Sequence, residues 1–157
     1  MSLLPGTIDN EYRGSRVALI FFVFMAVMTV ARSLIHIVAP DGGAQSIATI
    51  PLDSFTANGA ATVVHLFALW GLSQLIVGIV YVVALLRYRS LIPLLYALAL
   101  VEYVTRLALT WVKPMEIDGT APGGVGNYVL IPVLAVMLWL SLCRRAGRAS
   151  AGSPSGA

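Results

Sequence analysis

The sequence predicts an all-α integral membrane protein, a four-helix bundle with both termini in the cytoplasm. Of its 157 residues, 59% are hydrophobic and 11% are charged, and the mean hydropathy is +0.88. A soluble chain typically carries about 25% charged residues, because its core must be covered by a polar surface. The other two observations are four long apolar runs and a one-sided distribution of arginines. Together they exclude an ordinary water-soluble domain.

The four apolar runs set the predicted helices, because a spanning helix needs about 20 largely apolar residues. The predicted helices are residues 17–38, 62–86, 91–111 and 128–143. None of the runs alternates polar and apolar residues, which argues against a transmembrane barrel. The fourth run is the shortest, so its helix either begins earlier in the Gly-rich loop or lies where the bilayer is thin.

The helices are flanked by two polar segments. Residues 1–16 are predicted to be a cytoplasmic N-terminal segment, and residues 144–157 a disordered basic cytoplasmic tail. A cleaved signal peptide is the alternative for the first run. Asp9 and Glu11 in the leader, and the lack of a small-residue cleavage site after the run, argue against that alternative.

Arginines set the predicted orientation, because basic residues in short connections collect on the cytoplasmic side. In a bundle of four helices, both termini and the connection between helices two and three fall on one side. That side holds Arg13, Arg16, Arg87, Arg89, Arg144, Arg145 and Arg148. The loops on the opposite side contain one basic residue, Lys113, beside several acids. We therefore expect the outer loops, 39–61 and 112–127, to face away from the cytoplasm.

Local signals refine the ends of the helices. Ser90 is expected to cap the third helix, with Pro93 in its first turn, and Pro132 to lie in the first turn of the fourth. The first outer loop contains an apolar stretch, SIATIPL, that would rest on the membrane surface or cap the bundle. Neither outer loop has the spacing of a phosphate-binding glycine loop.

Ionisable residues inside the predicted helices are the main functional signal, since such residues are costly in hydrocarbon and usually face a bundle interior. They are Arg32, His36, His65, Glu102 and Arg106. Arg32 and His36 are four residues apart, as are Glu102 and Arg106, so each pair lies on one helix face. Gln74 and His65 point in nearly opposite directions from the second helix. We assign Gln74 to the interior and His65 to the interface.

Two interpretations of this cluster remain open. In the structural one, a buried Glu102 is neutralised by Arg32 and Arg106 and locks helix one to helix three. In the functional one, the second arginine leaves a surplus positive charge that is met by a loop acid such as Asp41, by water or by an anionic ligand. The predicted ligand-binding residues are Arg32, His36, Gln74, Glu102 and Arg106.

Other chemistries have weaker support. Two histidines and one distant cysteine, Cys143, do not form a metal-ligand spacing, so we expect no metal and no cofactor. The most specific hypothesis of cofactor binding is a haem held by His36 and His65, and we expect haem to be absent. No serine lies in a nucleophile elbow. Acid–base chemistry by Glu102 with His36 is conceivable, and no catalytic residue is assigned.

The chain resembles the DoxX-like group of small four-helix bacterial membrane proteins. The resemblance rests on an arginine late in the third helix, in the run Tyr103-Val104-Thr105-Arg106, and on the basic turn Arg87-Tyr88-Arg89-Ser90. It covers helices two and three best. Of the glycine pattern associated with that group, only Gly71 and Gly78 are present, so no site residue is inferred from the resemblance.

The leading functional hypothesis is that an outward-facing polar pocket binds or handles an amphipathic molecule such as a lipid, quinone or isoprenoid. The alternatives are a non-catalytic accessory subunit of a membrane complex and an intramembrane isomerase-like enzyme. Expected partners are membrane lipids or a small amphipathic ligand, with a membrane protein or a second copy as the other option, and no nucleic acid. Nine arginines to one lysine indicate a bacterium of high genomic GC content, and hence its plasma membrane, the inner membrane.

Overall fold

The computed structural model describes residues 2–114 and 117–143. It is all-helical, with four long helices, each long and apolar enough to cross a membrane. They are α1 (Arg16–Val38), α2 (Ala57–Arg87), α3 (Ile92–Val112) and α4 (Pro122–Leu142). Two short 3₁₀ turns, η1 (Leu52–Ser54) and η2 (Arg89–Leu91), lie before α2 and before α3. The prediction of an all-α chain with four long apolar helices is confirmed.

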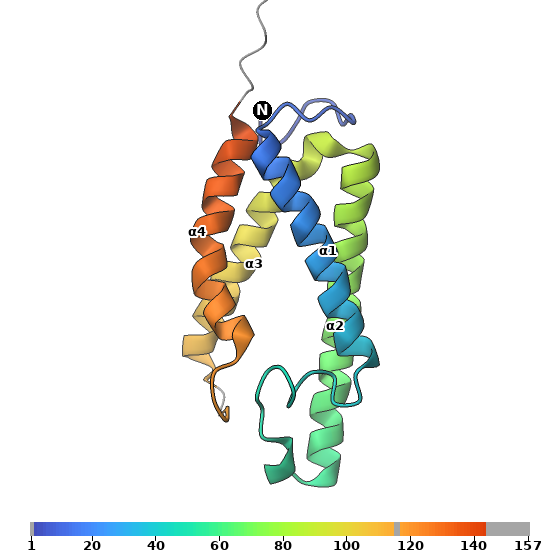
Figure 1. Ribbon diagram of the computed structural model, residues 1–157, viewed down its shortest axis with the longest axis vertical. Helices are drawn as coiled ribbons and strands as arrows, with labels where there is room; N and C mark the ends of the chain where they lie inside the picture. The colour runs from blue at the N-terminus through green and yellow to red at the C-terminus, as the bar shows by residue number, and fades with distance from the viewer. Residues whose placement is uncertain (1, 115–116, 144–157) are drawn as a thin grey trace, which may run out of the picture.

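The helices form two hairpins (Figure 1), in which α1 packs along α2 and α3 packs along α4. Two glycines of α2 allow the close approach of α1. A Cβ atom added to Gly71 would lie 2.7 Å from the Cβ of His36, and one added to Gly78 would lie 2.8 Å from a methyl group of Val30. Small residues at such contacts let backbones approach, which drives helix association where lipid replaces water.

One end of the bundle contains the main apolar core, which joins the two hairpins. Phe22 of α1 packs against Tyr81 of α2 and Tyr96 of α3, with ring centroids 5.1 and 5.3 Å apart. The Tyr96 hydroxyl donates a hydrogen bond of 2.6 Å to the carbonyl of Ala18. Leu134 of α4 completes this core. The hairpins are therefore held together by side-chain packing at the end where α1 begins.

The N-terminal segment crosses that same end of the molecule (Figure 1). The Asp9 carbonyl accepts hydrogen bonds from the amide and the hydroxyl of Ser90, and the Ser15 amide donates one to the carbonyl of Leu140. The segment thus touches the α2–α3 turn and the end of α4. It links both hairpins at the arginine-rich end.

Several predicted helix ends were wrong. Ser90 does not cap α3, because it lies in η2 and bonds to Asp9 instead, although Pro93 does lie in the first turn of α3. The helix α4 begins at Pro122, in the Gly-rich loop, as one of the two predicted alternatives has it. Pro132 therefore lies inside the helix and not in its first turn. The helix α2 begins five residues before the predicted 62, where the Thr56 hydroxyl accepts a hydrogen bond from the amide of Gly59. The predicted tail, 144–157, lies outside the described residues.

The first outer loop folds back onto the beginning of α2 and forms a second, smaller core. Ala44, Ile50 and Leu52 are buried there. They pack against the side chains of Ala48, Ala60, Val63, Val64 and Phe67. The apolar stretch of this loop therefore packs against the beginning of α2.

Candidate functional site

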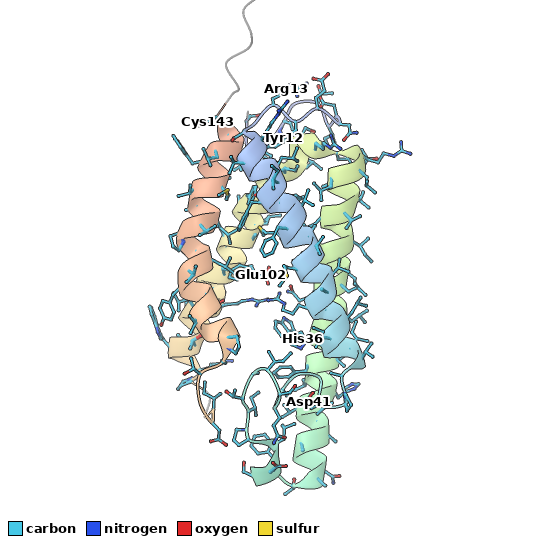
Figure 2. All side chains as sticks on the ribbon, viewed as in Figure 1. Tyr12, Arg13, His36, Asp41, Glu102 and Cys143 are labelled. Atoms are coloured by element: carbon cyan, nitrogen blue, oxygen red, sulfur yellow. The ribbon has the colours of Figure 1, made fainter. Side chains whose placement is uncertain are left out.

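A chain of polar side chains bridges the two hairpins near the middle of the molecule, where Glu102 points between them (Figure 2). The Glu102 carboxylate accepts a hydrogen bond of 2.5 Å from Arg106, one turn further along α3. It also accepts one of 2.9 Å from the Gln74 side-chain amide on α2. The Gln74 carbonyl oxygen in turn accepts a hydrogen bond of 3.0 Å from Arg32 on α1. We call these four residues the polar bridge.

The predicted pairing of Arg32 with Glu102 is therefore indirect. Arg106 forms an ion pair with Glu102, whereas Arg32 reaches that carboxylate only through Gln74. Gln74 can do this because an amide presents an acceptor and a donor side by side. Its side chain is 8% exposed, so both of its polar ends are used within the bundle.

Trp70 stands beside the polar bridge, one turn before Gln74 on α2. The guanidinium carbon of Arg32 lies 5.5 Å from the centre of the indole ring, and that of Arg106 lies 5.0 Å from it. A cation this close to an aromatic face is attracted by the ring quadrupole, more strongly where water is excluded. Trp70 therefore holds one arginine from each hairpin next to the same ring.

His36 is packed against this tryptophan. Its ring is 4.7 Å from that of Trp70 and 5.7 Å from that of Phe67, measured between centroids. Its Nδ1 atom lies 2.7 Å from the carbonyl oxygen of Gly42 in the first outer loop. The side chain is 4% exposed. His36 thus joins α1, α2 and the loop, and its hydrogen-bond partner is Gly42 rather than Glu102.

Asp41 is not the counter-ion of the arginines. Its carboxylate accepts hydrogen bonds from the backbone amides of Gly43, Gln45 and Ser46 in its own loop. The bond from the Ser46 amide is the main reason that the pKa of Asp41 falls to about 2. This carboxylate therefore stabilises the turn whose Gly42 carbonyl contacts His36. It does not neutralise the positive charge of Arg32.

Arg32 has unused hydrogen-bonding capacity. Its Nε atom is buried and, within the part of the chain that the structure describes, has no hydrogen-bond partner. An arginine presents five N–H donors and always carries its charge. The polar bridge contains one carboxylate for two guanidinium groups. That carboxylate, of Glu102, already bonds to Arg106 and Gln74. Such an arrangement can bind an oxyanion.

The structure brings together Arg32, Gln74, Glu102 and Arg106, with His36 adjoining through Trp70. His65 is exposed on α2 and takes no part in this cluster. Trp70 was not among the site residues predicted from the sequence. The signal was available, because residues 70 and 74 are four apart and lie on one helix face.

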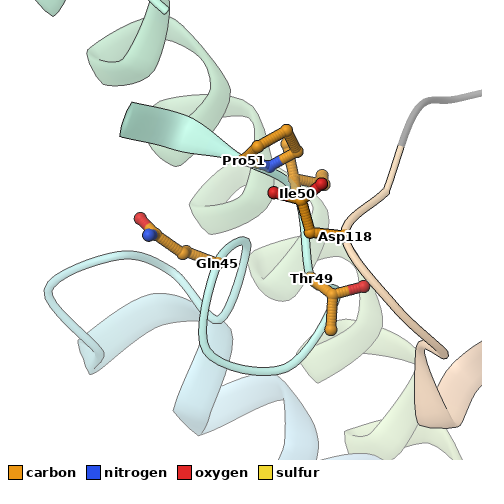
Figure 3. Close-up of a pocket in the computed structure, with 5 residues that line it drawn as sticks. All are labelled: Gln45, Thr49, Ile50, Pro51 and Asp118. Atoms are coloured by element: carbon orange, nitrogen blue, oxygen red, sulfur yellow. The ribbon is translucent and has the colours of Figure 1, made fainter. Parts of the chain in front are cut away.

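A separate small pocket of about 200 Å³ lies in the outer loops (Figure 3). It is lined by Gln45, Thr49, Ile50, Pro51 and Asp118. The Asp118 amide donates a hydrogen bond of 2.8 Å to the carbonyl of Thr49, which ties the second outer loop to the first. None of the residues of the polar bridge lines this pocket.

No protein-family model, curated protein or solved structure matches the chain. The resemblance to the DoxX-like group stays a prediction.

Proposed function

We propose that this chain is a multi-pass protein of a bacterial plasma membrane, and that its polar bridge binds the head group of an amphipathic molecule such as a lipid, quinone or isoprenoid. Both termini lie in the cytoplasm in this proposal. The polar bridge then lies in the outer half of the bilayer, and the ligand's hydrocarbon part lies in the membrane.

The apolar surface supports the membrane location. In the most apolar stretch of each helix, no more than 28% of the residues are buried within the molecule. Large aliphatic and aromatic side chains therefore cover its outside. Such a surface is favourable in contact with lipid and unfavourable in contact with water. Arg13, Arg16 and Arg87 are all exposed at the end of the bundle where the N-terminal segment lies. This distribution supports a cytoplasmic location for that end.

The observation that carries the binding proposal is the unmatched positive charge of Arg32 with its unpartnered Nε. A cation in a low-dielectric surrounding is expensive unless it is paired. An anionic or strongly polar head group would supply both the charge and the hydrogen-bond acceptor. Arg32 and Arg106 both lie beside the ring of Trp70, which places a second cation in the neighbourhood of the proposed ligand.

Native mass spectrometry of protein purified in a mild detergent tests this proposal. We expect wild-type protein to retain a small molecule, and Arg32→Gln to lose it. The matched control is Arg87→Gln, which removes an exposed arginine from the end of α2 and should retain the ligand. A small molecule held equally by both variants would contradict the proposal. Co-purification of a larger protein alone would support the accessory-subunit alternative, and turnover of added lipids the enzyme alternative.

Cysteine labelling tests the orientation. Cys143 is first replaced by serine, and a single cysteine is then placed at Gly123 or Ser2. A side chain at Gly123 meets no other atom within 4 Å, and Ser2 is exposed. In intact cells, we expect an impermeant maleimide to label the cysteine at position 123 and not the one at position 2. The reverse pattern would overturn the orientation.

A further inference from the structure

The two hairpins meet differently in the two halves of the bundle. Among the helical residues, all of which the structure describes, α3 has no buried residue beyond Ala99 and α4 has none before Leu134. Glu102 and Arg106 lie beyond Ala99, so the polar bridge joins the hairpins in the half where the side chains of α3 and α4 are at most partly buried. A polar head group carrying a hydrocarbon chain suits this place, because its head meets the bridge while its chain covers exposed apolar side chains.

The charges around the bridge add up to a small surplus. Arg32 and Arg106 supply two positive charges, and Glu102 supplies one negative charge. The helix α4 contains no Asp, Glu, Lys or Arg, and α2 contains none before Arg87; the His65 side chain of α2 is exposed. In the first outer loop, Asp41 is bonded to its own turn. The four residues of the polar bridge therefore carry one net positive charge between them.

Resting on the proposed function, we infer that the site selects head groups carrying a single negative charge on two equivalent oxygens, as in a carboxylate or a phosphodiester. Its oxygens would accept from guanidinium N–H groups of Arg32 and Arg106, the two arginines beside Trp70. A single negative charge brings the site to neutrality. A zwitterion or neutral head leaves the surplus in place, and a doubly charged head reverses it, at a high cost in a low-dielectric surrounding.

The fluorescence of Trp70 tests this selectivity in protein whose bridge residues are unchanged. In a Trp111→Phe/Trp139→Phe background, Trp70 is the only tryptophan. Lipids are added in a neutral detergent at alkaline pH: phosphatidylglycerol and oleate as single charges, phosphatidylcholine as a zwitterion, and phosphatidic acid as a double charge. We expect both singly charged lipids to bind at least about tenfold more tightly than the other two, which corresponds to about 1.4 kcal/mol. Comparison of phosphatidylglycerol with oleate separates the phosphodiester source from the carboxylate source.

Variants that change the charge give a second, independent readout. Glu102→Gln raises the surplus from one charge to two, so the preference should move to phosphatidic acid. Arg106→Gln removes the surplus, so phosphatidylcholine should bind as well as phosphatidylglycerol. The control, Arg87→Gln, should keep the wild-type order. Thermal melting of each variant shows which of them fold, and the wild-type lipid series stands if one does not.

The outcomes separate the two proposals. If no lipid alters Trp70 fluorescence and none is retained in mass spectrometry, the proposed function fails. If lipids bind with affinities that ignore head-group charge, or if wild-type protein prefers phosphatidic acid, binding stands and the selectivity for a single charge is overturned. An order that follows the charge in wild type and variants supports the inference.

Discussion

Replacing Glu102 by leucine is the sharpest test of the polar bridge. The change removes the only carboxylate of the bridge and leaves Arg106 and the amide of Gln74 without their acceptor. Breaking a fully buried ion pair costs about 3–5 kcal/mol, and an exposed pair is worth about 1 kcal/mol or less. The Arg106 and Glu102 side chains are 22% and 31% exposed. We therefore expect Glu102→Leu to lower the free energy of unfolding by about 2–3 kcal/mol, between these limits.

The measurement is thermal and denaturant unfolding in detergent, with a matched control. Glu11→Leu makes the same chemical change in the Arg13–Glu11 pair, where the glutamate side chain is 71% exposed. It should cost less than about 1 kcal/mol. Glu102→Gln should be milder than Glu102→Leu, because an amide oxygen still accepts one hydrogen bond.

A double-mutant cycle distinguishes a real bridge from an accidental contact. Arg106→Leu added to Glu102→Leu should recover part of the lost stability, because no stranded charge remains. Arg32→Leu in the same background should recover less, since Gln74 separates Arg32 from the carboxylate. If Glu102→Leu costs no more than Glu11→Leu and the double mutant is additive, the bridge does not hold the hairpins and the site built on it fails.

Three further predictions concern other parts of the molecule. Gly71→Ala should lower the melting temperature, because its Cβ would lie 2.7 Å from that of His36, whereas Gly126→Ala, with open space around it, should leave the temperature unchanged or raise it. Asp41 has a lowered folded-state pKa of about 2, so its stabilising effect should be complete above about pH 4 and lost towards about pH 2. The difference in melting temperature between wild type and Asp41→Asn should therefore shrink over that range. Purified protein should show no haem Soret band, and His36→Ala or His65→Ala should leave the absorption spectrum unchanged.

The four helices could be predicted from sequence because their signal is long and repeated. Each has enough apolar residues to outweigh local propensity, which also explains why the errors lie at the ends. The fourth apolar run is too short for a spanning helix, and this predicted an earlier start in the Gly-rich loop as one of two alternatives. The exact start at Pro122 was not predicted, because a proline followed by three glycines looks like a loop, although proline suits a first helical turn. Ser90 was misassigned because its partner, Asp9, lies 81 residues away in the chain.

The polar bridge could be predicted only in part. Helical spacing identifies Arg106 as a partner of Glu102, because both lie on one helix. It cannot show that Gln74 stands between Arg32 and Glu102, since that depends on how closely Gly71 and Gly78 bring α1 to α2. Nor can it show that Asp41 is used by its own loop. Because Asp41 bonds within its own loop, the net positive charge of the polar bridge remains available to a ligand.

The division of the bundle into an apolar half and a polar half has a consequence for binding. Apolar side chains gain little by leaving lipid for each other, so helices in a membrane are held by close packing and by polar contacts. Packing around Phe22 and Tyr96 supplies the first at one end of this bundle, and the polar bridge supplies the second further along. A ligand that bonds to a guanidinium N–H of Arg32 not used by Gln74 leaves that contact intact, and so binds without separating the hairpins. A ligand that must also displace Gln74 from Arg32 competes with the bridge, and its affinity is lowered by the cost of breaking it. Replacing Gln74 by leucine should therefore leave the affinity for a singly charged lipid unchanged in the first case and raise it in the second.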